Sequence, residues 1–205
     1  MPSNLVFALA VQRPGRGSAV AGLTLAGVAL ALLALPRPVL ATSEFFRALG
    51  IQAPQAMVEA PEFALPDLTG KIVRLKELRG RHVFLNFFAT WCGPCREEMP
   101  AMERLHQTYG GKGLVILAVD LEESAARVGK FVKELRLTFP AVLDGDGAVS
   151  RAFAVRGLPI TVLVDRDGRI LWRAFGSREW NNQAARKYFA AILDDRGRKA
   201  EGRKQ

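Results

Sequence analysis

A buried strand that runs directly into a pair of cysteines constrains this chain most. Residues 82–88, HVFLNFF, form a continuous apolar run, typical of a strand buried on both faces of a sheet. Cys92 and Cys95, the only cysteines in the chain, follow shortly after it. Pro94 then lies in the first turn of a helix predicted over 93–109, where its missing N–H does no harm. The thiols are therefore expected where a buried strand ends and a helix begins.

Strands and helices alternate along the rest of the chain. A hairpin is predicted over 62–75, around a Pro-Asp…Gly turn, and a second hairpin turns at Asp165-Arg166-Asp167-Gly168. The other predicted elements are strands at 114–119, 141–143, 160–164 and 169–175, and helices at 124–135, 147–154 and 180–193. This order predicts an α/β sandwich with a mixed sheet in the middle and no internal repeats.

The net charge of +9 does not indicate a nucleic-acid partner, because it lies at the two ends of the chain. The first 41 residues carry three arginines and no acid, and the tail from Arg196 carries five basic residues against Glu201. The middle of the chain keeps a charge of only +2. The tail is interpreted as a disordered, solvated end, with weak attraction to anionic lipid as the alternative.

The N-terminus predicts export. Residues 18–35 carry no charge, Arg13 and Arg16 precede them, and a small-residue site, Val39-Leu40-Ala41, follows. This order is that of a secretory signal peptide. The apolar run is also just long enough to cross a bilayer as an uncleaved anchor. Both interpretations place the remaining chain outside the cytoplasm, in an oxidising space such as the bacterial periplasm.

These signals divide the chain into four segments. The whole, at 205 residues and 49% hydrophobic, is large enough for one well-packed domain. The expected segments are a signal peptide or membrane anchor (1–41), a loose linker with about one helical turn (42–60), one domain (61–193) and a basic disordered tail (194–205).

Two cysteines separated by two residues could staple the fold, bind a metal or exchange electrons. A disulfide across so short a loop constrains the unfolded chain little. A zinc site needs four ligands, and the two histidines, His82 and His106, stand at no finger-like spacing from the thiols. Redox chemistry is therefore the favoured interpretation, with no metal and no cofactor.

The two thiols are expected to have different roles. At the helix start, unpaired backbone N–H groups and the helix dipole favour a thiolate at Cys92. Lowering a thiol pKa from ~8.5 to ~7 raises the nucleophilic fraction at neutral pH from a few per cent to about half. Cys95, one turn further in, is placed to attack the mixed disulfide that Cys92 forms with a partner. Gly93 and Pro94 leave the first sulfur uncovered.

The stretch VFLNFFATWCGPCREEMPAMERL resembles the active-site segment of the exported TlpA/ResA-like thiol-disulfide oxidoreductases, thioredoxin-superfamily proteins with a redoxin, or AhpC/TSA-like, domain. The similarity covers residues 61–193 and includes FALPDLTGKIVRLKELRG before the motif and VRGLPITVLVDRDGRI after it. It implies a thioredoxin fold with an N-terminal hairpin and an extra strand and helix near 141–154. Two mild departures, Phe88 and Ile160, are expected to tune partner fit without removing activity.

The resemblance also implies a substrate groove. Pro159 matches the family's cis-proline beside the disulfide, where it would present the backbone of Leu158 to an extended substrate segment. A plain proline at the start of a strand is the alternative. Trp91, just before the motif, is expected at the rim of this groove together with Gly93 and Pro94, or else in the core.

A third group, Glu98, is expected to assist the thiols. It follows Cys95 by three residues and so points to a similar side of the helix. In the ResA-like branch an acid here is buried, which would raise its pKa and let it exchange a proton with Cys95. Without the resemblance, Glu98 would be a surface acid of the first turn. Glu97 should be solvated, and the uncharged Asn86 on the strand cannot act as a base.

The resemblance implies an exported protein-disulfide reductase. Its expected partners are disulfide-bearing exported proteins, in cytochrome c maturation or metal-site assembly, and a membrane thiol donor of the DsbD/CcdA type. Oxidase or isomerase activity is left open, because the same motif serves both directions of electron flow. A peroxidase is a weaker alternative, since Ala89 and Leu85 replace the Thr or Ser and the Pro of peroxiredoxins, with Thr90 one residue off. A redox-inactive binding protein is the remaining alternative.

Overall fold

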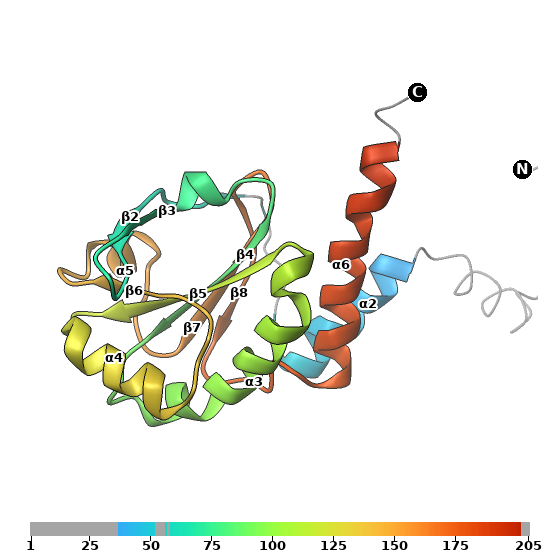
Figure 1. Cartoon of the computed structure of the whole chain (residues 1–205). Coiled ribbons are helices and arrows are strands. Elements are labelled where there is room, and N and C mark those ends of the chain that lie inside the picture. The colour runs from blue at the N-terminus through green and yellow to red at the C-terminus, as the bar shows by residue number, and fades with distance from the viewer. Residues whose placement is uncertain (1–36, 52–55, 57, 202–205) are drawn as a thin grey trace, which may run out of the picture. The chain divides into compact units, whose positions relative to one another are not determined.

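A six-stranded mixed sheet organises the chain (Figure 1). The computed structural model describes residues 37–51, 56 and 58–201, which belong to the compact unit of residues 36–205. The strand order is β1-β8-β7-β4-β5-β6. The strands are β1 (Val58–Glu59), β4 (His82–Phe88), β5 (Leu114–Leu121), β6 (Ala141–Asp144), β7 (Ile160–Val164) and β8 (Arg169–Phe175).

The central strand β4 separates a parallel from an antiparallel half. It pairs in parallel with β5, which pairs in parallel with β6, and on its other side it pairs antiparallel with β7. A separate hairpin joins β2 (Ala64–Pro66) to β3 (Ile72–Arg74), as predicted. The helices are α2 (Arg37–Leu49), α3 (Gly93–Tyr109), α4 (Ala125–Glu134), α5 (Ala148–Ala152) and α6 (Gln183–Glu201), with 3₁₀ turns at Leu75–Leu78 and Gly110–Lys112.

The sheet carries a hydrophobic core on each face. Side chains alternate along β4, so Phe84 and Phe88 face the core built with α2, α3, α4 and α6. Leu85 and Phe87 face the opposite core, which includes Leu65 of β2 and Phe153 after α5. Burial on both faces explains why this strand reads as an unbroken apolar run. The central mixed sheet flanked by helices confirms the predicted α/β class.

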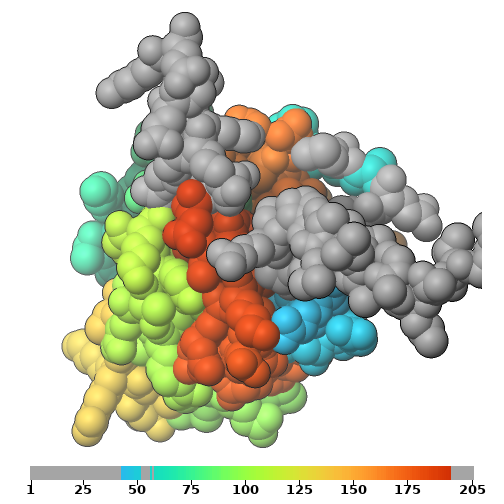
Figure 2. Space-filling view, turned by 90° about the vertical axis from the view of Figure 1, so that its right-hand side faces the viewer, coloured from blue at the N-terminus to red at the C-terminus, as the bar shows by residue number. Residues whose placement is uncertain are grey.

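Helix α2 is the main departure from the expected layout. The sequence predicted a loose linker over 42–60, whereas the structure has a helix through Leu49 and strand β1 at Val58–Glu59. The buried Phe45 explains the helix, because its ring stacks on Tyr188 of α6 with centroids 4.0 Å apart. Figure 2 shows α2 beside α6, and α3 along the other side of α6.

The two ends of the chain differ from expectation or fall outside the description. Helix α6 starts at Gln183 and continues to Glu201, so the expected disordered tail from 194 is helical as far as Glu201. The apolar segment 18–35, expected to be a signal peptide or an anchor, lies outside the described residues. Within the described ranges, no helix is both long and apolar enough to span a bilayer.

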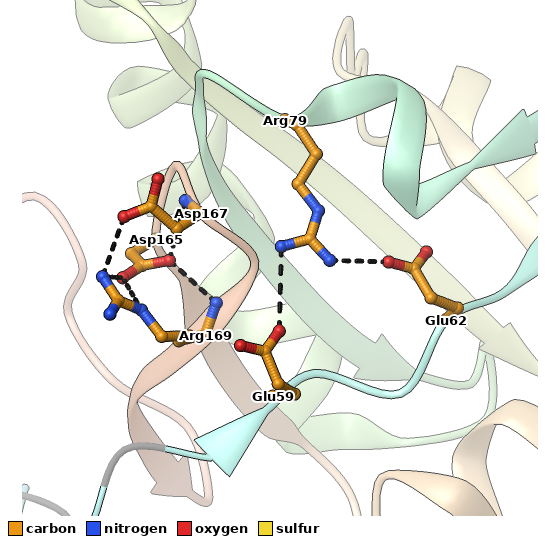
Figure 3. Close-up of polar contacts among 6 residues, drawn as sticks. All are labelled: Glu59, Glu62, Arg79, Asp165, Asp167 and Arg169. Atoms are coloured by element: carbon orange, nitrogen blue, oxygen red, sulfur yellow. Dashed lines mark hydrogen bonds and ion pairs between the residues drawn. The ribbon is translucent and has the colours of Figure 1, made fainter.

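Ion pairs link neighbouring segments of chain at one end of the sheet (Figure 3). Arg79 lies between Glu62, with an N–O distance of 2.8 Å, and Glu59, with a distance of 3.8 Å. In the β7–β8 turn, the Asp165 carboxylate accepts the backbone N–H of Asp167 and of Arg169 at 2.9 and 2.8 Å. The register places this turn beside the start of β4, at the end of the sheet opposite the cysteines.

Candidate active site

The two cysteines form a disulfide at the end of β4. Their sulfurs are 2.05 Å apart and their Cα atoms 5.3 Å apart. Cys92 is the N-cap residue of α3, and its Sγ lies 3.2 Å from the backbone N–H donor of Cys95. That N–H and the helix dipole would stabilise a thiolate on Cys92 after reduction, as the sequence predicts.

The sulfurs differ in access. Cys92 is 6% exposed, whereas Cys95 is fully buried. Trp91 beside them is 68% exposed, so it lies at the surface and not in the core. Gly93 and Pro94 are exposed as well. This arrangement lets a partner approach from the Cys92 side, while Cys95 is reached only from within the domain.

Glu98 lies inside the domain on the same helix as the cysteines. Its side chain is buried, unlike that of the exposed Glu97. Asn86 of β4 donates to one carboxyl oxygen at 2.7 Å. The Trp180 indole N–H and the Arg178 backbone N–H donate to the other oxygen, at 2.8 and 3.1 Å. The carboxyl group is thus held by three donors from two distant segments of chain.

This environment brings the pKa of Glu98 close to neutral pH, where the carboxyl group can both take up and release a proton. Burial raises its pKa to about 7, although the hydrogen bonds from Trp180 and Asn86 act in the opposite direction. Neutral Asn86 can donate to the carboxyl group but cannot replace it as a base. The resemblance implied a buried Glu98, whereas the residues alone favoured a surface acid, and neither indicated Trp180 or Arg178.

The loop before β7 brings the predicted proline to the same end of the sheet. The Leu158–Pro159 bond is cis, as the resemblance implied. Pro159 is buried and Leu158 half-buried. The next residue, Ile160, pairs with Phe87 of β4, five residues before Cys92. The register therefore sets the predicted groove residues and the disulfide at one edge of the sheet.

A second carboxylate, that of Glu123, contacts the loop before the cysteines and was not predicted from the sequence. Glu123 follows β5, and its two oxygens accept the backbone N–H and the hydroxyl of Thr90, at 2.5 and 2.7 Å. Thr90 thus directs its hydroxyl hydrogen to Glu123. No sequence signal reveals this contact, because it depends on the parallel pairing of β4 with β5, which sets Phe88 beside Asp120 and brings the loops after both strands to one edge.

Comparisons with known proteins agree with this geometry. Residues 57–173 match the model of a family described as the AhpC/TSA family. The chain is similar to the thiol-disulfide oxidoreductase ResA of Bacillus thuringiensis subsp. konkukian, at 42% identity over 120 residues, 58% of this chain and 69% of the relative. ResA of Geobacillus thermodenitrificans is 46% identical over 111 residues, 54% of this chain and 64% of the relative.

A solved structure shares the fold. The thiol:disulfide interchange protein DsbE of Chlorobium tepidum aligns with a TM-score of 0.62 at 35% identity. The alignment covers 67% of this chain and 96% of that one.

Proposed function

Since this chain belongs to the AhpC/TSA family and is a thiol-disulfide oxidoreductase of thioredoxin fold, we propose that it reduces disulfides of partner proteins outside the cytoplasm. The observation that carries the proposal is the buried carboxyl group of Glu98, one turn beyond the buried Cys95 and with a pKa of about 7. A buried thiol needs such a group, because water cannot easily take its proton.

The proposed reaction passes two electrons to the partner. The Cys92 thiolate attacks one sulfur of the partner disulfide, so an S–S bond forms to Cys92 and the partner's other sulfur leaves as a thiolate. Cys95 then gives its proton to Glu98 and attacks Cys92, which forms the Cys92–Cys95 disulfide and releases the partner's second thiolate. The partner gains two electrons and, with two protons, becomes a dithiol.

The wider setting is also a proposal. Export rests on the apolar segment 18–35, whether it is cleaved or retained as an anchor. An oxidising compartment would leave the cysteines as a disulfide, so a membrane thiol donor would have to reduce them again. Partner disulfides in cytochrome c maturation or metal-site assembly fit this role.

The first test is the reduction potential of the full chain, equilibrated against dithiothreitol and glutathione buffers. A value near that of thioredoxin, about −270 mV, is expected for a reductase. A value near −120 mV would reverse the proposed direction and make the protein an oxidase or isomerase.

A second test addresses the role of Glu98. In the Glu98→Gln variant, exchange with a disulfide substrate should slow near pH 7 and lose its dependence on a group that ionises there, while the fold is retained. Glu97→Gln, an exposed neighbour, serves as the matched control. An unchanged pH–rate profile in Glu98→Gln would remove Glu98 from the mechanism.

A further inference from the structure

We propose that Glu123 is a positioning residue for thiol-disulfide exchange, because it holds the loop that carries Cys92 through Thr90. The inference rests on exchange at Cys92, as the proposed function does, and it holds for either direction of electron flow. Both hydrogen-bond donors of Thr90, the backbone N–H and the hydroxyl, donate to the Glu123 carboxylate at 2.5 and 2.7 Å. Thr90 is two residues before Cys92.

The carboxylate is built into the domain and is not a mobile surface group. The Glu123 side chain is only 5% exposed. Burial acts to raise the pKa of Glu123, but the hydrogen bonds from Thr90, together with those from Asp120 and Arg127, hold the pKa below its usual range. Glu123 is therefore ionised at neutral pH, and hydrogen bonds to an ionised acceptor are the stronger kind.

The loop that presents Glu123 is itself held in an uncommon conformation. Glu122 has a φ of 60°, which is unfavourable for a residue with a side chain. Its backbone N–H donates to the Asp144 carbonyl oxygen at 3.2 Å, and the next N–H, that of Glu123, donates to the Asp120 carboxylate at 3.0 Å. Strain of this kind persists only where the surroundings fix it, and here it directs Glu123 toward Thr90.

The consequence reaches the sulfur through a short turn. The Cys92 N–H donates to the Ala89 carbonyl oxygen at 3.1 Å, which closes a turn around Thr90. In the oxidised protein the disulfide also fixes Cys92, but reduction removes that bond. Thr90 and Glu123 then keep the turn in place, so that the freed sulfur stays at the start of α3, where the helix lowers its pKa.

The test compares variants of the full chain in the reduced state. Thr90→Val removes the hydroxyl donor at nearly constant shape and leaves the charge of Glu123, whereas Thr90→Ser keeps the donor. Glu123→Ala removes the acceptor. The thiolate of Cys92 is titrated by its ultraviolet absorbance, and the rate of exchange with a glutathione disulfide is measured alongside. Glu97→Gln is the control for loss of an acid on α3.

We expect Thr90→Val and Glu123→Ala to raise the pKa of Cys92 by about one pH unit, which lowers the thiolate fraction below that pKa about tenfold. Exchange should slow accordingly, while Thr90→Ser and Glu97→Gln match the unaltered protein. An unchanged pKa and rate in Thr90→Val would overturn the proposal. A lower pKa of Cys92 in Glu123→Ala would also overturn it. Removing a nearby negative charge lowers the pKa of a thiol, so that result would mean that Glu123 acts only through its charge and does not position the loop.

The result separates this inference from the proposed function. If the unaltered chain does not exchange disulfides at all, the proposed function fails and the variants have nothing to modify. If it exchanges disulfides but all variants behave alike, only the role of Glu123 fails.

Discussion

At the scale of single residues, the carboxyl group of Glu98 is held by donors from separate parts of the chain, while its burial raises its pKa. Asn86 lies twelve residues before it and Trp180 eighty-two residues after it. Asn86 stands in the apolar run before the cysteines, but no sequence signal links Trp180 to the site. A carboxyl group that is surrounded by donors and still keeps a pKa of about 7 is governed by burial, because its hydrogen bonds alone would lower that value.

The raised pKa of Glu98 makes stability depend on pH. Between the ordinary value of 4.5 and about 7, the unfolded chain has released this proton and the folded chain keeps it. The folded state therefore binds more protons, and its stability falls as pH rises through this window. We expect the unaltered protein to lose roughly 2–3 kcal/mol more than Glu98→Gln between pH 4.5 and pH 8, measured by urea unfolding of the oxidised forms.

Asp120 contributes to the same pH dependence of stability. Burial and the neighbouring Glu123 raise the pKa of Asp120 to about 7 as well, so Glu98→Gln should keep part of the slope. Glu97→Gln should keep all of it. If Glu98→Gln has the same pH dependence as the unaltered protein, the carboxyl group does not titrate in this window.

At the scale of elements, α2 completes a core that the remaining helices leave open. Phe45 lies among aromatic rings of β8 and α6, at centroid distances of 5.3 Å from Trp172 and 4.0 Å from Tyr188. The guanidinium of Arg178 donates to the Leu49 carbonyl oxygen at 2.7 Å, at the end of α2. The segment that reads as a linker is thus a structural part of the domain.

Truncation of Phe45 should therefore destabilise the whole domain. We expect Phe45→Ala to lower the free energy of unfolding by about 3–5 kcal/mol, because it opens a cavity among buried rings. Phe175→Ala is the matched control, since Phe175 is 63% exposed and its loss should change stability by less than about 1 kcal/mol. Equal effects of the two changes would show that α2 does not contribute to the folded core.

Elements with local sequence signals were predicted correctly, and those that depend on distant contacts were not. The bounds of β4 and α3 agree with prediction, because a run of apolar residues, a proline in the first helical turn and a Gly-Gly end are local signals. Helix α2 was missed because its partner surface on α6 lies more than a hundred residues away. The link between Thr90 and Glu123 was missed for the same reason, being a contact across 33 residues.

At the scale of the whole molecule, the two ends of the sheet have different tasks. One end carries the cysteines, Glu98 and the cis-proline, while the other end holds the ion pairs around Arg79 and the β7–β8 turn. Gly168 in that turn has a φ of 88°, and a Cβ atom added there would overlap the Arg79 guanidinium. The backbone N–H of Ala60 donates to the Gly168 carbonyl oxygen at 2.9 Å, which links the segment after β1 to this turn.

A change at the end of the sheet that holds Arg79 and the β7–β8 turn should therefore alter stability without altering the redox chemistry. We expect Gly168→Ala to lower the free energy of unfolding by about 1–3 kcal/mol, chiefly through the unfavourable φ, and to leave the reduction potential unchanged. Gly145→Ala is the control, because Gly145 has no positive φ and open space at the Cβ position. A shifted potential in Gly168→Ala would mean that the two ends are coupled.

The contact between Glu98 and Trp180 also gives the molecule an optical property. Ionisation of Glu98 puts a negative charge 2.8 Å from the indole nitrogen of Trp180, whose ring stacks on Trp172 at a centroid distance of 5.8 Å. Of the three tryptophans, only Trp91 is exposed. The fluorescence of the buried pair should therefore follow the protonation of Glu98. Trp172 and Trp180 are then an intrinsic reporter of the proton transfer on which the proposed chemistry depends.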